Sequence, residues 1–289
     1  MSLAELSQQI VNGMVIGSVY VLIALGLSII FGILEIPHFS HGSVSMLAGY
    51  TAYWLVQLLH LNFFVSMLLA MIVAAVIGIL VERIAYRPVR GAPPINSFII
   101  ALGLMLIIDN LALIFFGPDQ VIIKTPYNNV LKIGSIILVD LRLYILAVSI
   151  ILTVGLFIFV QKFKIGKAIR AVAQNREASA AVGININVIS STIFVIGSAI
   201  GAAAGAFFGA LYAIYPVMGG QIVLKGFAVL ILGGLGSMPG AVLGGLILGI
   251  AESIGAGMIS SSYKDVIAFM VMICVLLIKP SGLLGRSAQ

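Results

Sequence analysis

Charged residues are scarce in this chain of 289 residues. Only 8% of the positions are Asp, Glu, Lys or Arg, and 62% are hydrophobic, against about 25% and roughly 45–50% in a typical soluble domain. A single soluble core could not bury so much apolar surface. The uncharged runs 6–34, 36–81, 178–224 and 226–251 each exceed the roughly 20 residues that a helix needs to cross a bilayer. We therefore predict an all-α, polytopic membrane protein with one transmembrane domain over 1–289.

Other absences narrow the class of protein further. Cys274 is the only cysteine, which excludes a disulfide within the chain. The opening MSLAELSQQIVNG has no basic segment before its apolar run, so we expect no cleaved signal peptide. No phosphate-binding loop of the form G-x-x-x-x-G-K-[ST] occurs, because Lys167 is followed by Ala168 and position 161 is Gln161. This chain is therefore not expected to hydrolyse ATP by that chemistry.

The excess of positive charge, +6 in total, is gathered in two short segments. Short basic loops beside membrane spans are typical of the cytoplasmic side. No aromatic residues interleave with a basic surface, so we expect no nucleic-acid binding. The charge therefore indicates topology. The two groups are Arg83, Arg87 and Arg90, and then Lys162, Lys164, Lys167, Arg170 and Arg176.

The apolar segments of the whole chain predict eight membrane crossings. They predict nine helical segments if a break in 226–251 divides that run into two. The break is GGLGSMPG at 233–240, where four glycines and a proline make unbroken helix improbable. A single pass would leave Lys279 and Arg286 outside, whereas two passes would place them in the cytoplasm, which the positive-inside rule favours. We place the N-terminus and 117–142 outside. The expected spans are 10–34, two within 36–81 with a turn near 60–62, 96–116, 143–160, 190–215, two pieces of 226–251, and 265–278.

Glycines recur every four residues at Gly197, Gly201, Gly205 and Gly209. This spacing keeps them near one helix face and predicts close helix packing, with a lining of the substrate path as the alternative. This glycine-rich span stops before Pro216, and the first span, also rich in glycine, stops before Pro37. Because the two spans are expected to run in opposite directions, an inverted repeat of the kind common in transporters is possible.

The stretch EIPHFSHG at 35–42 interrupts the first uncharged region with Glu35, His38 and His41. A zinc site takes four ligands, three of them from protein at a catalytic site, and no distant His or Cys pair completes this set. We interpret the stretch as a polar bend and predict no metal. Asp109 and Glu252 are intramembrane acids, which would be the functional groups of an ion-coupled carrier as the alternative class.

The segment GKAIRAVAQNREASAAVGI at 166–184 differs from the spans in composition. We predict one amphipathic helix ended by Gly183, which is either an interfacial helix or a docking surface for a partner. Its predicted apolar side contains Ala168, Ala171, Val172, Ala178 and Val182.

Within this segment, REASAAVG at 176–183 resembles the EAA-x-x-x-G signature of bacterial ABC-importer permeases. Glu177, Ala178 and Gly183 match, and Ser179 replaces the second alanine. Segments at 12–34, 41–50, 82–90, 166–178 and 232–252 resemble the branched-chain amino acid ABC permease family in order along nearly the whole chain, specifically its LivH-like subunit. Where that family usually shows I-N-F-A-H-G, this chain has PHFSHG at 37–42.

The resemblance implies a permease subunit of an importer, and not an enzyme, in the bacterial inner membrane. The implied partners are a second, unlike permease subunit, two cytoplasmic ATPase subunits that bind ATP and Mg, and a periplasmic substrate-binding protein. The implied substrate is a branched-chain or other hydrophobic amino acid, and relatives that carry urea, short amides or other amino acids leave an alternative. No cofactor is expected in this chain itself.

The resemblance and the breaks together select candidate site residues. The coupling segment lies within 162–189, and its family role is to enter a groove on the ATPase and transmit its motion. The substrate path is expected at the two breaks, where freed backbone groups can meet a zwitterion. The coupling candidates are Gly166, Lys167, Arg170, Glu177, Ala178 and Gly183, and the path candidates are His38, Phe39, His41, Gly42, Gly233, Gly234 and Gly236.

Overall fold

Helices form most of the part of the chain that the structure describes. A computed structural model describes residues 2–134, 136–260 and 263–285. Within these residues one β-hairpin joins two of the helices. The elements are α1 Leu3–Leu34, α2 Ser40–Leu59, α3 Phe63–Val81, the π-helical turn η1 Glu82–Tyr86, α4 Pro94–Phe116, β1 Val130–Ile133, β2 Ile136–Val139, α5 Asp140–Lys162, α6 Lys164–Gln174, α7 Arg176–Ala181, α8 Ile186–Leu211, α9 Met218–Gly233, α10 Met238–Met258 and α11 Lys264–Ile278.

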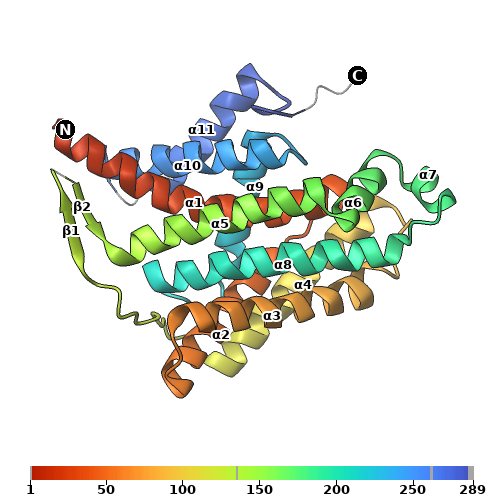
Figure 1. Cartoon of the computed structure of the whole chain (residues 1–289), viewed down its shortest axis with the longest axis horizontal. Helices are drawn as coiled ribbons and strands as arrows, with labels where there is room; N and C mark the ends of the chain where they lie inside the picture. Colours follow the sequence, from red (N-terminus) through yellow and green to blue (C-terminus); the bar gives the residue numbers. More distant parts are fainter. Residues whose placement is uncertain (1, 135, 261–262, 286–289) are drawn as a thin grey trace.

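Among the described residues, six helices are long and apolar enough to cross a membrane, and α9 is a shorter apolar helix. The six are α1, α3 continued by η1, α4, α5, α8 and α10. Several of them run along the long axis of the molecule (Figure 1). Many apolar side chains of α4 face outward, with Ile114 75% and Phe115 76% exposed. The prediction of an all-α, polytopic membrane protein is confirmed.

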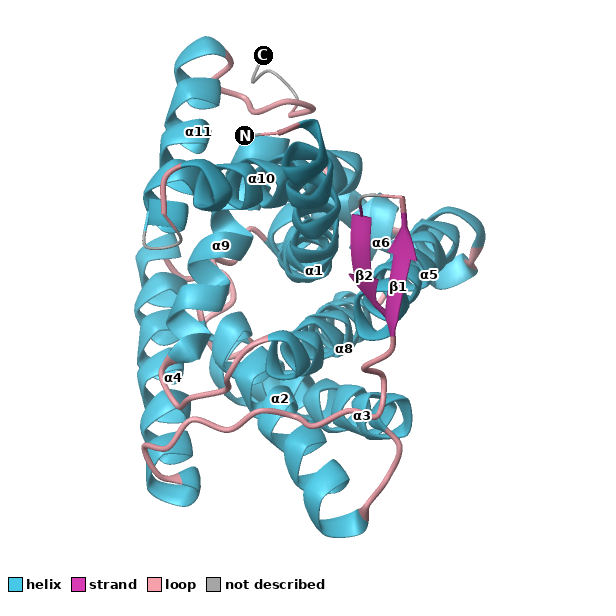
Figure 2. Ribbon diagram, turned by 90° about the vertical axis from the view of Figure 1, so that its left-hand side faces the viewer, coloured by secondary structure: helices cyan, strands magenta, loops and turns pink. Residues whose placement is uncertain are grey.

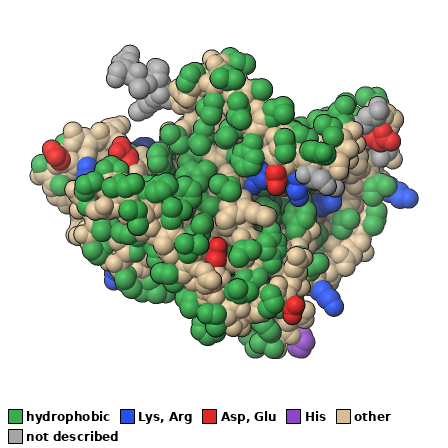
Figure 3. All heavy atoms as spheres, turned by 180° about the vertical axis from the view of Figure 1, so that it is seen from behind, with side chains coloured by type: hydrophobic (Ala, Val, Ile, Leu, Met, Phe, Trp, Pro, Cys, Tyr) green, Lys and Arg blue, Asp and Glu red, His purple; other side chains and the backbone are tan. Residues whose placement is uncertain are grey.

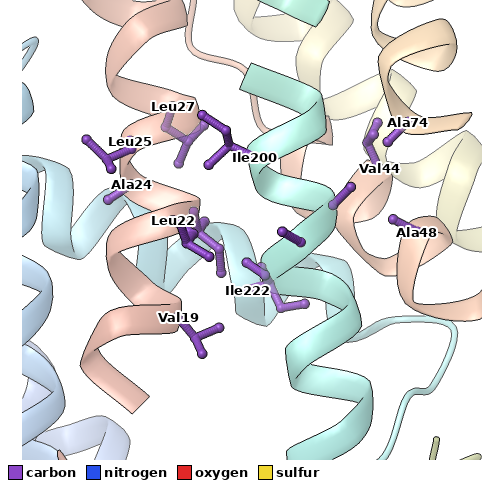
Figure 4. Packing of buried hydrophobic residues seen from close by; sticks show 14 of the residues in the cluster. Val19, Leu22, Ala24, Leu25, Leu27, Val44, Ala48, Ala74, Ile200 and Ile222 are labelled. Carbon is purple, nitrogen blue, oxygen red and sulfur yellow. The ribbon is translucent and has the colours of Figure 1, made fainter. Parts of the chain in front are cut away.

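The core is built around α1, which is buried along most of its length. Figure 2 shows α1 between α10 and α8. Close contacts pair Gly13 of α1 with Ile250, and Gly17 with Gly245, so α1 and α10 run antiparallel. Leu22 and Leu27 of α1 and Ile200 of α8 lie between α1 and α8 (Figure 4).

Three of the regularly spaced glycines of α8, Gly197, Gly201 and Gly205, pack against α1 and α2, and Gly209 packs against Ile214 and Ile123. A Cβ atom on Gly197 would lie 3.0 Å from the carbonyl oxygen of Gly26, and one on Gly205 would lie 1.8 Å from that of Ser45. Such distances leave no room for a side chain, because the backbones themselves are in contact. The prediction of close helix packing is confirmed for this stripe.

The break at 233–240 divides its run into two antiparallel helices. Gly233 at the end of α9 contacts Gly240, and Gly244 of α10 contacts Val229. The Ser237 hydroxyl caps α10 by accepting a hydrogen bond from the Gly240 amide at 3.1 Å. The predicted break is therefore confirmed, and it turns the chain back across the molecule.

The chain beyond α11 returns to the end of the molecule where α1 stops. Gly285 lies against Gly234, which is in the loop between α9 and α10. Gly236 of the same loop lies against Gly32 in the last turn of α1. Two passes by α9 and α10 explain this position, and a single pass does not. The described tail, which includes Lys279, thus lies on the side of the basic loops, as the positive-inside rule favours; Arg286 lies outside the described residues.

The two glycine-rich spans, α1 and α8, are antiparallel, and each is followed by an irregular segment with a proline and then by a further helix. The helices that follow, α2 and α9, meet at their first turns through Gly42 and Gly219. The two halves therefore have the opposite orientations that an inverted repeat requires.

Three local features differ from the expectation. The first helix begins at Leu3 instead of residue 10, because Ser2 and Glu5 form a capping box. Residues 82–86 continue α3 as η1. A hairpin, paired from Val130–Val139 to Ile133–Ile136, occupies part of 117–142.

Candidate functional site

At the end of the molecule that carries the basic loops, α6 folds sharply back from α5. A Cβ atom on Gly166 would lie 2.3 Å from the carbonyl oxygen of Phe159, so only glycine fits at this turn. The Arg170 guanidinium donates a hydrogen bond to the Val160 carbonyl, and the side chain of Ile169 on α6 is buried. Gly166 and Arg170 therefore fix the base of the segment.

The predicted single helix over 166–183 is two helices. Asn175 interrupts it, and its side-chain oxygen accepts a hydrogen bond from the Ala178 amide at 2.8 Å, which makes Asn175 the N-cap of α7. Ala178 is exposed and Val182 is 78% exposed. The predicted apolar side shared with Ala168, Ala171 and Val172 is therefore wrong for Ala178 and Val182, because the cap redirects the chain.

The short helix α7 projects from the body of the molecule (Figure 1). Glu177 is exposed like Ala178, and Lys167 on the preceding helix is exposed as well. Ser179 is the one buried residue of α7. The acidic Glu177 and the apolar Ala178 thus form an exposed surface on the capped helix α7.

The predicted glycine stop at Gly183 is confirmed. Gly183 has φ of +88°, its amide donates to the Ala180 carbonyl at 3.0 Å, and the Ile184 amide donates to the Ser179 carbonyl at 3.0 Å. This pair of hydrogen bonds is a Schellman motif.

Glu82 has a buried carboxylate near the end of the molecule that carries α6 and α7, and the sequence did not predict it as a site residue. Glu82 is fully buried and pairs with Arg87 and Arg90, each at 2.7 Å. Its carboxylate also accepts from Ser191 at 2.9 Å, and Arg90 donates to Ser190 at 2.7 Å. The hydrogen bond to Glu82 raises the pKa of the Arg87 guanidinium. These arginines thus join the first basic loop to α8, a role that charge counting along the sequence does not reveal.

The polar bend places His38 and His41 in the interior, both buried, with ring centroids 5.6 Å apart. The His38 Nδ1 atom lies 3.1 Å from the Tyr86 hydroxyl. The His41 ring fills a notch, since a Cβ atom on Gly26 or Gly201 would lie 2.8 or 2.6 Å from its Nε2 atom. Both histidines are therefore enclosed by protein.

The other members of this bend lie differently. Phe39 is partly buried and its ring packs against Phe98 and Phe227, at centroid distances of 5.4 and 4.7 Å. Gly42 lies in backbone contact with α9. Glu35 is exposed, so the three groups of the rejected metal hypothesis do not converge. Among the described residues, no three His, Cys, Asp or Glu side chains are placed to hold a metal ion.

The glycines of the second break, Gly233, Gly234 and Gly236, lie at the turn between α9 and α10. The tail closes over this turn: the Leu283 amide donates to the Leu232 carbonyl and the Leu284 amide to the Gly233 carbonyl, both at 2.9 Å. The carbonyls freed by the break are therefore satisfied within the chain.

A cavity at the opposite end was missed by the sequence reasoning. It has a volume of about 460 Å³, and its walls come from α1, α5, α8, α9, α10, α11 and the loop before α9. Lys225 lies within it, paired with Glu252 and, at 2.8 Å, with Asp265. The lone charge of Lys225 between Glu177 and Glu252 in the sequence was the signal that could have found it.

Asp109 lies elsewhere, buried in α4. It accepts a hydrogen bond from the Ser43 hydroxyl at 2.6 Å, in the first turn of α2. This contact ties α4 to the place where α2 and α9 meet.

The bundle of apolar helices contains two antiparallel glycine-rich helices, α1 and α8, each followed by a break. It carries a projecting capped helix at one end and a cavity at the other. Together these features define a transport protein of the permease class. The family model described as "Branched-chain amino acid transport system / permease component" matches residues 9–276. The chain belongs to this family of permease components, as the sequence resemblance predicted.

Individual relatives align along nearly the whole length. BraD of Pseudomonas aeruginosa, named as a high-affinity branched-chain amino acid transport system permease protein, is 37% identical, with 96% of this chain and 95% of BraD covered. LivH of Salmonella typhimurium, with the same description, is 35% identical, and LivH of Escherichia coli K12 is 34% identical, each with 96% and 95% covered. These relatives are transport permease subunits.

Proposed function

We propose that this chain is the membrane-spanning permease subunit of a binding-protein-dependent ABC importer for branched-chain or other hydrophobic amino acids, in the bacterial inner membrane. The family match over 9–276 carries the proposal, and the projecting α7 supports it. Import would proceed from the end with the cavity toward the end with α7.

The remaining components of the importer would be separate chains. A periplasmic substrate-binding protein would deliver the amino acid, a second, unlike permease would complete the membrane part, and two cytoplasmic ATPase subunits would bind ATP and Mg. The assembled complex would be an ATP-driven translocase, whereas this chain would hold no cofactor.

The coupling role falls to α6 and α7. Gly166 and Arg170 would anchor the segment to α5, while the exposed Lys167, Glu177 and Ala178 would meet the ATPase. Motion of the ATPase would reach the spans because α6 packs directly on α1 and α5. The projecting helix is short and is capped at both ends, by Asn175 and by Gly183. It would therefore move as a rigid unit and transmit the motion of the ATPase to α6.

The test is ATP-dependent uptake by the reconstituted complex. We expect Glu177→Ala and Gly183→Ala each to reduce uptake strongly while the complex still assembles in the membrane. Matched controls are Asp119→Ala, at an exposed acid, and Gly134→Ala, at a glycine that also has a positive φ, +61°, at the other end of the molecule. Unchanged uptake in both coupling variants would reject the assignment.

The path candidates His38, Phe39, His41, Gly42, Gly233, Gly234 and Gly236 remain predictions. The enclosed position of the two histidines favours a role in holding α1, α2 and α8 together. An importer of the same family that carries urea, short amides or other amino acids is the alternative. Binding measurements on the substrate-binding protein of the same importer would separate these substrates.

An ion-coupled carrier is the second class of function. It would need acids that are free to take up an ion, but Asp109 is bound by Ser43 and Glu252 by Lys225 and Tyr20. Transport by this chain in vesicles without any ATPase would favour the carrier and reject the importer.

A further inference from the structure

The cavity lies at the end of the molecule away from α7. Its walls include Gln9 near the start of α1 and Tyr20 in its middle, which are roughly 16 Å apart along the helix at about 1.5 Å per residue. The cavity thus reaches from the outer end well into the bundle. Its volume of about 460 Å³ falls within the range of about 300–1,000 Å³ that is usual for small-molecule sites.

Two buried charges form the inner wall of the cavity. Glu252 and Lys225 are 3% and 9% exposed and form an ion pair, and the Tyr20 hydroxyl donates to Glu252 at 2.7 Å. Charges within a membrane bundle are expensive to bury, and such groups mark functional sites by default. A buried pair of this kind adds little net stability compared with apolar packing, so stability alone does not account for it.

The cavity also carries charges nearer its mouth. Asp265, with 57% of its side chain exposed, contacts the Lys225 ammonium. Arg142 donates a hydrogen bond to Asn12, and the Lys264 ammonium lies over the ring of Tyr212, 5.5 Å from its centroid. Figure 3 shows acidic and basic side chains beside one another on a face otherwise largely hydrophobic.

The charge count of the cavity points to the chemistry of its ligand. Its lining contains three cations, Arg142, Lys225 and Lys264, and two acids, Glu252 and Asp265. Lys225 is shared by both acids, which leaves Arg142 and Lys264 without a carboxylate partner among the described ion pairs. Arg142 and Lys264 are thus available to a ligand carboxylate, while Asp265, with its exposed side chain, is available to a ligand ammonium.

The rest of the lining favours a small molecule with an apolar part. Ile16, Phe208, Met218 and Ile222 contribute apolar walls beside these charges. We propose that the cavity is an outward-facing binding site for a zwitterionic α-amino acid with an apolar side chain. The carboxylate is held by Arg142 and Lys264, the ammonium by Asp265, and the side chain lies toward Ile16 and Ile222.

This proposal rests on the proposed function, because the ligand is the molecule that the importer would carry. It adds a station within this chain where the amino acid released by the binding protein is held before passage. The Lys225–Glu252 pair positions Asp265 and closes the inner wall, so it is a positioning pair and not a ligand contact.

Protection of a thiol from modification tests the site without relying on transport. In a Cys274→Ala background of the complete complex in proteoliposomes, Ala256→Cys places a thiol on the cavity wall and Lys132→Cys places one outside it. We expect L-leucine to slow the modification of the cavity thiol by a membrane-impermeant maleimide and to leave the outer thiol unaffected. Leucinamide and 4-methylpentanoate, which each lack one charge, protect less.

Arg142→Gln in the Ala256→Cys background tests the carboxylate contact. We expect roughly tenfold more leucine to be needed for half-protection, as for the loss of one charge-assisted hydrogen bond, and no change with Lys124→Gln, an exposed cation outside the cavity. Leucine that fails to protect the cavity thiol up to its solubility, in vesicles that still take up leucine, overturns the site and leaves the proposed function intact. Equal protection by leucinamide and 4-methylpentanoate overturns the charge pairing. Protection without ATP-dependent uptake supports the site and counts against the importer.

Discussion

Gly42 and Gly219 bring the first turns of α2 and α9 into backbone contact. A Cβ atom on Gly42 would lie 2.0 Å from the Gly219 carbonyl oxygen, and one on Gly219 would lie 2.7 Å from the Cα atom of Ser43. Each of these helices follows a proline-containing break after a long glycine-rich helix. Their meeting therefore joins the first and second halves of the chain at one point.

Gly42→Ala should destabilise the protein because the added methyl group collides with backbone, which cannot move away as a flexible side chain can. We expect a loss of about 1–3 kcal/mol in the free energy of unfolding. Gly103→Ala is the matched control, since a Cβ atom there meets nothing within 4 Å and should stabilise α4 by up to about 1 kcal/mol. Thermal unfolding in detergent measures both, and equal midpoints would contradict the contact.

The notch around His41 predicts coupling between two positions. Gly201→Ala places a methyl group against the imidazole, and His41→Ala removes the ring. Each change alone should destabilise the protein, but the double variant should lose less than the sum by about 1 kcal/mol or more. Unfolding of the four proteins in detergent measures the difference, and additive losses would show that the ring lies elsewhere.

Removing the charge of Glu82 should loosen the end of the molecule that carries α7. Glu82→Gln leaves Arg87 and Arg90 without their carboxylate and is expected to cost about 3 kcal/mol of stability. Asp119→Asn, an exposed acid at the far end, should cost nothing measurable. The rate of proteolysis within the loop 87–93 measures this local loosening. A loop that is as resistant to protease as in the unaltered protein would contradict the prediction.

Lys225 and Glu252 should behave as one unit. Lys225→Met leaves a buried carboxylate and Glu252→Gln leaves a buried ammonium that retains only Asp265. Each single variant should therefore be less stable than the double variant. Unfolding midpoints of the three proteins decide this, and a double variant that is the least stable of them would show that the pair contributes net stability.

The sequence predicts features that depend on neighbouring residues. The break at 233–240, the stop at Gly183 and the packing of the α8 glycines all follow from local backbone chemistry, and the structure bears them out. The interruption at Asn175 was missed because alanine-rich composition on both sides masks a capping residue. Asn is a strong N-cap, and the acid two residues later at Glu177 was available as a further signal.

Other features depend on partners that are distant in the chain. Lys225 and Glu252 meet because α9 and α10 are antiparallel, and Asp265 joins them from a third helix. No spacing rule along one helix predicts such a contact. The same holds for Glu82 and Ser191, which lie on η1 and α8.

Leucine uptake by proteoliposomes tests the central claim most directly. The vesicles would contain this chain with a second permease and two ATPase subunits, with the binding protein added outside and ATP inside. We predict uptake that requires both ATP and the binding protein and is lost in Glu177→Ala but not in Asp119→Ala. Leucine uptake that persists without ATP and without the binding protein would contradict the account.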